Sequence, residues 1–303
     1  MFRRIVVGAD GTSEGRDAVA LGASIATATG AGLTLLQSFP PPLISTTDSS
    51  DRRSLARQAE KLLASDRRKF APTAHTEVAA DSNTARALCL NAERWHADLV
   101  VIGSSRRAAS GRCSIGQTGR GLLDRAPFAL AIARRGLHEE DVQLSRIAVG
   151  YDGGAESKLA LYFADQLATG ADAELLIQTV VQERLPSLTY GGFLETEKWD
   201  ELRELDRLSA LALSRDAAAG TTARSQADAR IGYPGFLLRE LSESVDLMVI
   251  GSRRWGVIAR VVLGGVGETL ASDCGSSLLI TCRSLRVPNP PPAREADHEK
   301  ASS

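Results

Sequence analysis

Two stretches of the sequence pair glycines in a way that could hold a phosphate group. In the first, an apolar run ends at Gly103 and a further glycine follows at Gly116; in the second, Gly251 and Gly264 repeat this spacing. A strand that runs into a glycine-bearing loop and then a helix can bring backbone N–H groups close to an anion. The same arrangement also makes a tight strand-to-helix turn. The recurrence is the stronger observation, because it indicates two copies of one unit.

Basic residues accompany each glycine pair. Arg106 and Arg107 lie in the first loop, and Arg253 and Arg254 lie in the second. A guanidinium group can donate two parallel hydrogen bonds to a phosphate. Arginines in a loop are, however, most often simply solvated, and the sequence leaves both interpretations open.

An aspartate follows the first apolar run of each copy, at Asp10 and at Asp152. Its carboxylate could accept hydrogen bonds from the hydroxyl groups of a ribose. A local turn or helix cap is an equally reasonable interpretation, because aspartate is suited to that role as well.

The first half alternates apolar runs, suited to strands buried on both faces, with segments of helical periodicity. This alternation predicts a parallel sheet covered by helices on both faces. Ligands of such sheets bind beyond the carboxyl ends of the strands, and Asp10 and Gly103 are both expected at that rim. The predicted strands span residues 5–9, 33–39, 75–80, 99–103 and 129–134.

The second half repeats this order of elements, with predicted strands over residues 147–150, 174–181, 223–231, 247–251 and 277–282. A length of 303 residues also agrees with two domains. We therefore expect similar domains over residues 1–136 and 146–284, joined by a polar linker over 137–145. Residues 285–303 are rich in proline and then in charge, which predicts a disordered tail.

Composition excludes several classes of function. The formal net charge of −1 gives no reason to expect a nucleic acid or an anionic membrane as partner. The four cysteines have no metal-site or disulfide spacing, which is typical of a reducing compartment. The chain has neither the pattern of a signal peptide nor an apolar run long enough to span a membrane. We expect a cytoplasmic protein.

The sequence resembles a tandem universal stress protein, with both halves similar to that family's single domain. The resemblance rests on IVVGADGTSEG and IAVGYDGGAES near the first strands and on DLVVIGSS and DLMVIGSR near the fourth strands. It implies two similar open α/β domains, each a five-stranded parallel sheet with helices on both faces. This fold is Rossmann-like and similar to that of the adenine nucleotide alpha hydrolases. The resemblance also implies that the halves pair with each other through their last strands, over residues 129–134 and 277–282.

Family members that bind ATP resemble one another in a loop pattern, G-x2-G-x9-G-[ST]. Here the first and third glycines correspond to Gly103 and Gly116, and to Gly251 and Gly264. Arginine replaces the second glycine in both halves. Gln117 and Gly265 stand at the hydroxyl position, where the neighbouring Thr118 could substitute in the first half but Val266 could not in the second.

The resemblance implies a candidate site for ATP, with Mg²⁺ if the nucleotide binds, in each half. An arginine at the second glycine position could bind the phosphates or block them. The candidate nucleotide-binding residues are Asp10, Gly103, Ser104, Arg106, Gly116 and Thr118 in the first half, and Asp152, Gly251, Ser252, Arg254, Gly264, Gly265 and Val266 in the second.

No constellation of residues predicts catalysis or a metal site. The four histidines, His75, His96, His138 and His298, have no partner at catalytic or metal-ligand spacing. We expect a non-catalytic stress-response protein that senses an adenine nucleotide. The alternative is a nucleotide-free regulatory protein that acts through a protein partner or as a homodimer. A weak ATPase or an adenylate-forming enzyme is less favoured, because the first loops lack an SGGxDS-type sequence.

Overall fold

The computed structural model describes residues 1–41, 49–123, 127–182, 196–255 and 260–282. The expected disordered tail therefore lies outside the described residues. In the first half, strands and helices alternate as expected: β1 (Arg4–Gly8), α1 (Ser13–Thr29), β2 (Gly32–Phe39), α2 (Ser49–Phe70), β3 (His75–Ala80), α3 (Thr84–Arg94), β4 (Leu99–Gly103), α4 (Gln117–Leu123) and β5 (Ala129–Ala133).

The second half repeats this order after the 3-10 turn η1 (Leu137–Glu139), with one additional short strand. Its elements are β6 (Arg146–Gly150), α5 (Ala155–Ala171), β7 (Glu174–Gln182), α6 (Thr196–Ala219), β8 (Ser225–Gly232), α7 (Pro234–Ser242), β9 (Leu247–Trp255), β10 (Arg260–Val262), α8 (Gly265–Ser272) and β11 (Ser277–Cys282).

The strands of the two halves form one continuous sheet, in the order β3-β2-β1-β4-β5-β11-β9-β6-β7-β8. The five strands that each half contributes to this sheet are parallel to one another, whereas β5 and β11 pair antiparallel, with Ile132 opposite Leu278. The α/β class, with a five-stranded parallel sheet in each half, is confirmed, and the pairing of β5 with β11 joins the two sheets into one. The last strands of the two parallel sheets would each expose an edge, and their pairing covers both edges.

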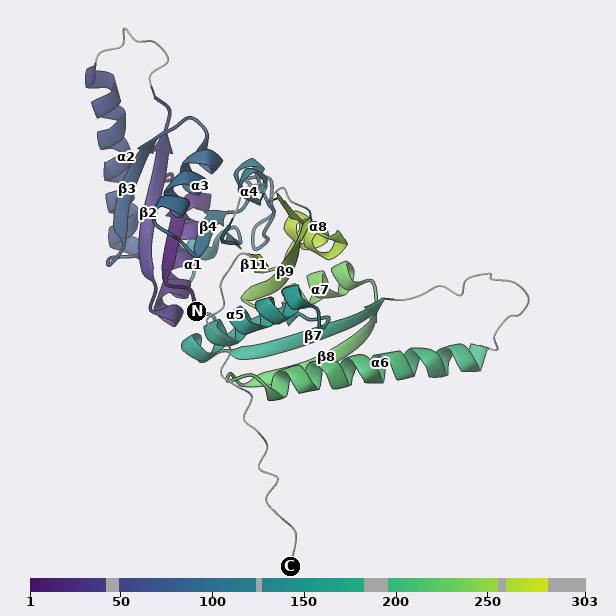
Figure 1. Ribbon diagram of the computed structural model, residues 1–303. Coiled ribbons are helices and arrows are strands. Elements are labelled where there is room, and N and C mark those ends of the chain that lie inside the picture. The colour runs from purple at the N-terminus through teal and green to yellow at the C-terminus, as the bar shows by residue number, and fades with distance from the viewer. Residues whose placement is uncertain (42–48, 124–126, 183–195, 256–259, 283–303) are drawn as a thin grey trace, which may run out of the picture.

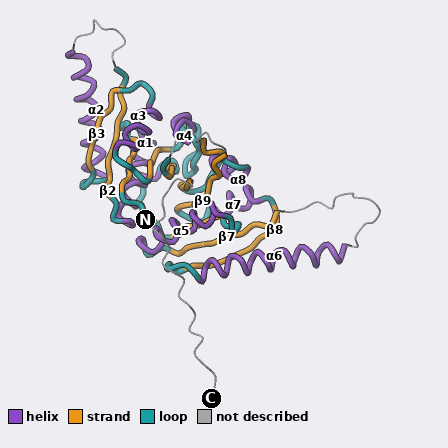
Figure 2. Tube along the Cα trace, viewed as in Figure 1, coloured by secondary structure: helices purple, strands orange, loops and turns teal. Residues whose placement is uncertain are grey.

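Both faces of the sheet are buried. Successive side chains of a strand point in opposite directions, so each strand contributes side chains to both faces. Ile5 and Val7 pack in one hydrophobic cluster together with α1 and α5, while Val6 packs in the other cluster with α3 and α7. Figure 2 shows helices on both sides of the strands. Both clusters contain residues of both halves, so the core is continuous across the join.

The join is also tight between helices. An added Cβ at Gly170 in α5 would lie 1.8 Å from the carbonyl oxygen of Ala28 in α1. The rings of Phe2 and Phe163 stack with centroids 4.5 Å apart. Figure 1 shows α1 and α5 where the two halves meet. The halves are therefore packed against each other as well as joined by strand pairing.

The expected polar linker is partly buried. Leu137 and Leu144 are 6% and 5% exposed, and the carboxylate of Asp17 in α1 accepts hydrogen bonds from the backbone of Gly136 and His138, both at 2.9 Å. The ring Nδ1 of His138 lies 2.6 Å from the same carboxylate. These contacts fix the linker to the first half.

The strand that was expected over residues 247–251 is longer in the structure. It continues to Trp255 and pairs antiparallel with β10, which the sequence analysis did not predict. In the second half, the chain after Gly251 therefore continues as a strand and pairs antiparallel with β10. Among the described residues, no helix has both the length and the apolar character needed to cross a membrane.

Asp66 gives a prediction about pH. Its side chain is buried between α2 and α1, with Oδ1 accepting from Nε of Arg16 at 3.3 Å and Oδ2 lacking a hydrogen-bond partner among the described residues. Burial raises the pKa of Asp66, which Arg16 only partly offsets. A raised pKa stabilises the fold below the ordinary pKa of aspartate, and this contribution is lost as pH rises through the folded value.

We expect the Asp66→Asn variant to keep its stability as pH rises through the folded pKa of Asp66, because asparagine does not ionise. Relative to wild type, the variant's urea midpoint should rise as pH increases from about 4 towards 7. Urea unfolding of both proteins across this range measures the difference at each pH. A difference that does not change with pH would contradict the prediction.

Candidate functional site

Each half has one cleft beyond the carboxyl ends of its strands, where the strand order reverses. In the first half this point lies between β1 and β4, and in the second between β6 and β9. Open α/β sheets bind ligands at such points. The cavities measure about 740 Å³ in the first half and about 400 Å³ in the second.

The structure brings the candidate residues of the first half together. The first cleft is lined by residues from β1, α1, β2, α3, β4 and α4 and from the loop between β4 and α4. Its lining includes all six residues singled out in the sequence of this half: Asp10, Gly103, Ser104, Arg106, Gly116 and Thr118.

Asp10 builds the turn from β1 into α1. Its Oδ1 accepts hydrogen bonds from the backbone N–H of Thr12, at 3.0 Å, and from the Thr12 hydroxyl. The Thr12 hydroxyl oxygen in turn accepts from the N–H of Gly15 at 3.1 Å and so caps α1. Asp10 is therefore a turn residue that also lines the cleft, and its Oδ1 already has partners.

Asp152 has a related role at the start of α5. Its Oδ1 accepts from the N–H of Gly154 at 2.9 Å and from the hydroxyl of Ser157 at 2.6 Å. The turn interpretation of both aspartates thus has direct support in the hydrogen bonds.

Gly103 and Gly251 are required by close packing. An added Cβ at Gly103 would lie 2.1 Å from the carbonyl oxygen of Glu14, and one at Gly251 would lie 2.4 Å from that of Glu156. Contacts this short do not occur, so the end of each fourth strand can approach the first turn of the helix only without a side chain. The first glycine of the loop pattern has a structural reason that is independent of any ligand.

The loop after β4 is closed at its base by Ser104. This residue is 6% exposed, and its hydroxyl accepts from the N–H of Ser114 at 2.8 Å and donates to the Ser114 carbonyl at 3.2 Å. A turn follows, in which the N–H of Ala108 donates to the carbonyl of Ser105 at 2.9 Å. The Ser104 hydroxyl therefore serves the loop itself.

Arg106 and Arg107 occupy the middle of that turn, with exposed side chains at the edge of the cleft. Arg106 is not among the non-glycine residues with positive φ, so its backbone does not require a glycine. Arg135 holds the turn by donating from Nη1 to the carbonyls of Arg106, at 3.1 Å, and Ala108, at 2.8 Å. The backbone of this turn is thus fixed while both guanidinium groups reach solvent.

The rest of the loop docks on the second half of the chain. Cys113 and Cys274 exchange two backbone hydrogen bonds of 2.8 and 2.9 Å, and the N–H of Ile115 donates to the carbonyl of Ala271 at 2.7 Å. The guanidinium of Arg112 pairs with Asp273. This ion pair raises the pKa of Arg112 and lowers the pKa of Asp273. One half therefore shapes the loop that borders the other half's cleft.

Gly116 and Thr118 lie at the start of α4. An added Cβ at Gly116 would meet nothing closer than 3.7 Å, so this glycine leaves space open. Thr118 is half-buried and lines the cleft, one residue after Gln117, the first residue of the helix. The third glycine of the pattern therefore differs from the first, because packing does not require it.

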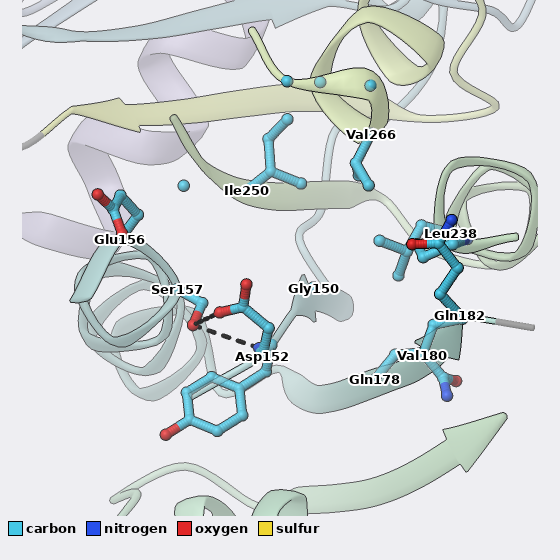
Figure 3. Close-up of a pocket in the computed structure, with 16 residues that line it drawn as sticks. Gly150, Asp152, Glu156, Ser157, Gln178, Val180, Gln182, Leu238, Ile250 and Val266 are labelled. Carbon is cyan, nitrogen blue, oxygen red and sulfur yellow. Dashed lines mark hydrogen bonds between the residues drawn. The ribbon is translucent and has the colours of Figure 1, made fainter. Parts of the chain in front are cut away.

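The second cleft is smaller and more apolar. Val180, Leu238, Ile250 and Val266 line it, as Figure 3 shows, opposite Asp152 and Ser157. Tyr151 stands where the first half has Ala9, and its burial raises the pKa of its hydroxyl, with nearby Asp152 adding to the effect. The cleft also contains Gly251, Gly264 and Gly265.

Two candidates of the second half are not placed in this cleft. Ser252 is 3% exposed, and its hydroxyl donates to the carbonyl of Thr281 at 2.9 Å. The backbone of Arg254 pairs with Val261 in β10, but its side chain lies outside the described part of the chain.

Comparison with known proteins identifies the family. The sequence pattern of the universal stress protein family matches residues 1–134 and again residues 144–281. The chain belongs to the universal stress protein family. The repeat and the α/β fold of this universal stress protein thus agree with the resemblance seen in its sequence.

Relatives and solved structures agree with this assignment. The chain is 26% identical over 187 residues to universal stress protein Rv2005c of Mycobacterium tuberculosis and to universal stress protein Mb2028c of Mycobacterium bovis. The match spans 57% of this chain and only 58% of each relative. A universal stress protein from Archaeoglobus fulgidus has a similar fold, with a TM-score of 0.67, 17% identity and coverage of 92% and 98% of the two chains. A putative universal stress protein from Pseudomonas aeruginosa also has a similar fold, with a TM-score of 0.60, 15% identity and coverage of 93% of each chain.

Several residues of this universal stress protein's clefts were not singled out in the sequence. Glu14 and Glu156 line the two clefts, and their backbone carbonyls explain the two fourth-strand glycines. Each follows its turn aspartate by the same interval, so the repeat itself could have revealed them. The docking of Cys113 on Cys274 had no such signal, because the two residues are distant in sequence and lack a shared motif.

Charged side chains line both clefts of the universal stress protein, although those of Arg253 and Arg254 lie outside the described residues. The first has two arginines and two carboxylates, and the Nε of Arg135 lies 3.7 Å from Oε1 of Glu14. The described residues of the second cleft include the carboxylates Asp152 and Glu156 but no cation. Within the described ranges, no group of three or more metal-ligating side chains was found.

Proposed function

We propose that this universal stress protein is a cytoplasmic, non-catalytic stress-response protein whose first cleft binds an adenine nucleotide, with Mg²⁺ accompanying ATP. The phosphates would lie against residues 103–107 and 116–118. The base would lie towards β1 and β2, where Leu36, Leu88 and Ile102 line the cleft.

One observation carries the proposal: Arg106 and Arg107 extend from a fixed turn beside open space at Gly116. The turn is held by Arg135, so a bound anion would not need to order the backbone. Guanidinium groups bind phosphate strongly because they combine charge with a planar set of donors. We assign the nucleotide to the first half because its cleft is the larger, about 740 Å³ against about 400 Å³, and because it has the hydroxyl of Thr118 where the second cleft has Val266.

Absence of turnover is part of the proposal. The two carboxylates of the first cleft are Asp10, which holds the turn into α1, and Glu14, which lies beside Arg135. A general base needs a free lone pair directed at its water, and a carboxylate that is engaged in a turn or lies beside a cation is poorly suited to this.

A specific observation favours the alternative of a nucleotide-free regulatory protein. Gly103 and Gly251 are explained by their approach to Glu14 and Glu156, and both aspartates are explained by their turns. The features that both halves share would then serve the fold alone. Function would lie in surfaces that contact other proteins.

Calorimetric titration with ATP and Mg²⁺ distinguishes these functions. We expect wild type to bind one equivalent and Arg106→Gly to bind about tenfold more weakly, since one charge-assisted contact is lost. Arg254→Gly is the matched control, because it makes the same change at the same position of the other half, and it should bind as wild type does.

Three other results would overturn the proposal. Binding by Arg106→Gly but not by wild type would show that the arginine blocks the cleft. Absence of binding in all three proteins would leave the nucleotide-free function. Equal weakening by both variants would mean that the nucleotide is not confined to the first cleft.

A further inference from the structure

The outer surface of α6 carries leucines that no described residue covers. Leu202, Leu205 and Leu208 are 48%, 59% and 47% exposed, and the exposed residues Ser209 and Ala212 continue the same side of the helix. We call these five residues the α6 leucine face. Single exposed leucines are ordinary on a protein surface, whereas a continuous helical stripe of them indicates an interaction site.

This face lies opposite the side of α6 that packs on the sheet. Ala210 and Ser214 are buried, and the Ser214 hydroxyl lies 3.4 Å from the carbonyl of Asp228 in β8. With 3.6 residues per turn, Leu205 and Ala212 point away from these two residues. Figure 1 shows α6 as the outermost element of the second half, with its N-terminal end extending beyond the strands.

The equivalent helix of the first half has no such face. Leu62 of α2 and Leu213 of α6 occupy equivalent positions, because a Cβ added at Gly11 would lie 3.2 Å from Leu62 and one added at Gly153 would lie 3.3 Å from Leu213. With this pairing of positions, the residues of α2 that correspond to Leu202, Leu205 and Leu208 are Asp51, Ser54 and Arg57. The repeated fold therefore does not require the leucines, and they are an addition to the second half.

A second copy of the chain cannot pair with β5 or β11, because these strands pair with each other. The edges of β5 and β11 are already paired with each other, and α1 packs on α5 beside them. A further copy of the chain must use another surface. The α6 leucine face lies near the far end of the sheet, beside the edge strand β8.

We propose that the α6 leucine face binds the same face of a second copy of this chain, with the two α6 helices antiparallel. Charges at the ends of the face support this orientation. Glu201 and Arg215 are both exposed and make no ion pair with other described residues. They lie on the same edge of the helix, about 21 Å apart along its axis.

A twofold axis near Leu208 makes these charges complementary. Glu201 of each helix then lies opposite Arg215 of the other, so the contact contains two such pairs. Leu208 lies beside its own copy, and Leu205 lies near Ala212 of the second helix. A parallel arrangement would instead place Glu201 level with Glu201 and Arg215 level with Arg215, so the opposite charges would not pair.

The mass of the protein in solution tests the proposal. Light scattering at about 100 µM should give twice the chain mass of 32.2 kDa for wild type. Leu205→Glu should weaken association about 100-fold, because each dimer buries the new charge twice. Leu90→Glu on α3 is the matched control, since Leu90 is 57% exposed but lies in the other half, and it should remain dimeric.

Cross-linking tests the orientation without disturbing the leucines. Ser209→Cys places thiols next to the axis, so glutathione disulfide should convert this variant to a covalent dimer. Glu201→Cys, on the same side of the helix, should not cross-link, because its two copies would lie about 21 Å apart along the helices. The four native cysteines are buried, so wild type provides the background.

A monomeric wild type would overturn the proposal and would direct attention to a different protein as the occupant. A dimer that survives Leu205→Glu, or equal cross-linking at residues 201 and 209, would also overturn it. The first result would place the contact elsewhere, and the second would exclude the antiparallel arrangement.

Discussion

Replacing Gly170 with alanine is expected to lower the free energy of unfolding by about 3 kcal/mol. The added Cβ would lie 1.8 Å from the carbonyl oxygen of Ala28 and 2.8 Å from its carbonyl carbon. Both atoms belong to the backbone of α1, so no side-chain rotation relieves the contact. The helices α1 and α5 must separate, and the core that continues across the two halves must open with them.

The direction of this effect is informative. Within a helix, replacing glycine with alanine ordinarily stabilises by about 1 kcal/mol because alanine has the higher helix propensity. A loss of stability at Gly170 therefore reports the packing of one half on the other. Urea unfolding followed by circular dichroism gives the free energy of unfolding for both proteins.

Gly265→Ala is the control for Gly170→Ala. It also adds one methyl group to a helix, but nothing lies within 4 Å of the new Cβ. It should be neutral or slightly stabilising. If Gly170→Ala were as stable as wild type, the close approach of α1 to α5 in the structure would be wrong.

The sequence predicted the repeated α/β order well, because each central strand is a short apolar run and each run is buried on both faces. Residues 99–102 show this, since all four side chains are buried and alternate between the two hydrophobic clusters. Local pattern was sufficient here because burial of such a strand does not depend on which partners it meets.

Contacts between residues that are far apart in the chain could not be predicted from the sequence. No local pattern marks Cys113 and Cys274 as neighbours, although their backbone pairing fixes the loop beside the first cleft. The continuation of β9 through Arg253 and Arg254 was missed as well, because charged residues gave no strand signal. The pairing of β5 with β11 came from the family resemblance and not from the strands' own residues.

Glycine positions were the hardest to interpret. Gly103 and Gly116 look alike in the sequence, as two elements of one pattern. In the structure, Gly103 is packed against the backbone of α1, whereas Gly116 is next to open space. The difference arises from Glu14, which is remote in sequence and comes close only in the fold. Loop patterns of this kind therefore combine structural and binding requirements.

That difference leads to a large expected effect at the first cleft. Gly103→Ala should lower the free energy of unfolding by about 3 kcal/mol, because the new Cβ would lie 2.1 Å from the Glu14 carbonyl oxygen. The first turn of α1 must move, and with it the turn that Asp10 and Thr12 build. Urea unfolding in the absence of nucleotide measures this loss.

Gly116→Ala separates stability from binding. Its new Cβ would make only ordinary contacts, at 3.7 Å from Ser105, so the variant should unfold within about 0.5 kcal/mol of wild type. The methyl group would nevertheless occupy the space proposed for the phosphates and should weaken ATP binding. Weaker binding by Gly103→Ala alone would say little, because a distorted turn impairs any ligand, whereas weaker binding by a fully stable Gly116→Ala would locate the nucleotide. A stable Gly116→Ala that binds ATP as wild type does would exclude the phosphates from this end of the cleft.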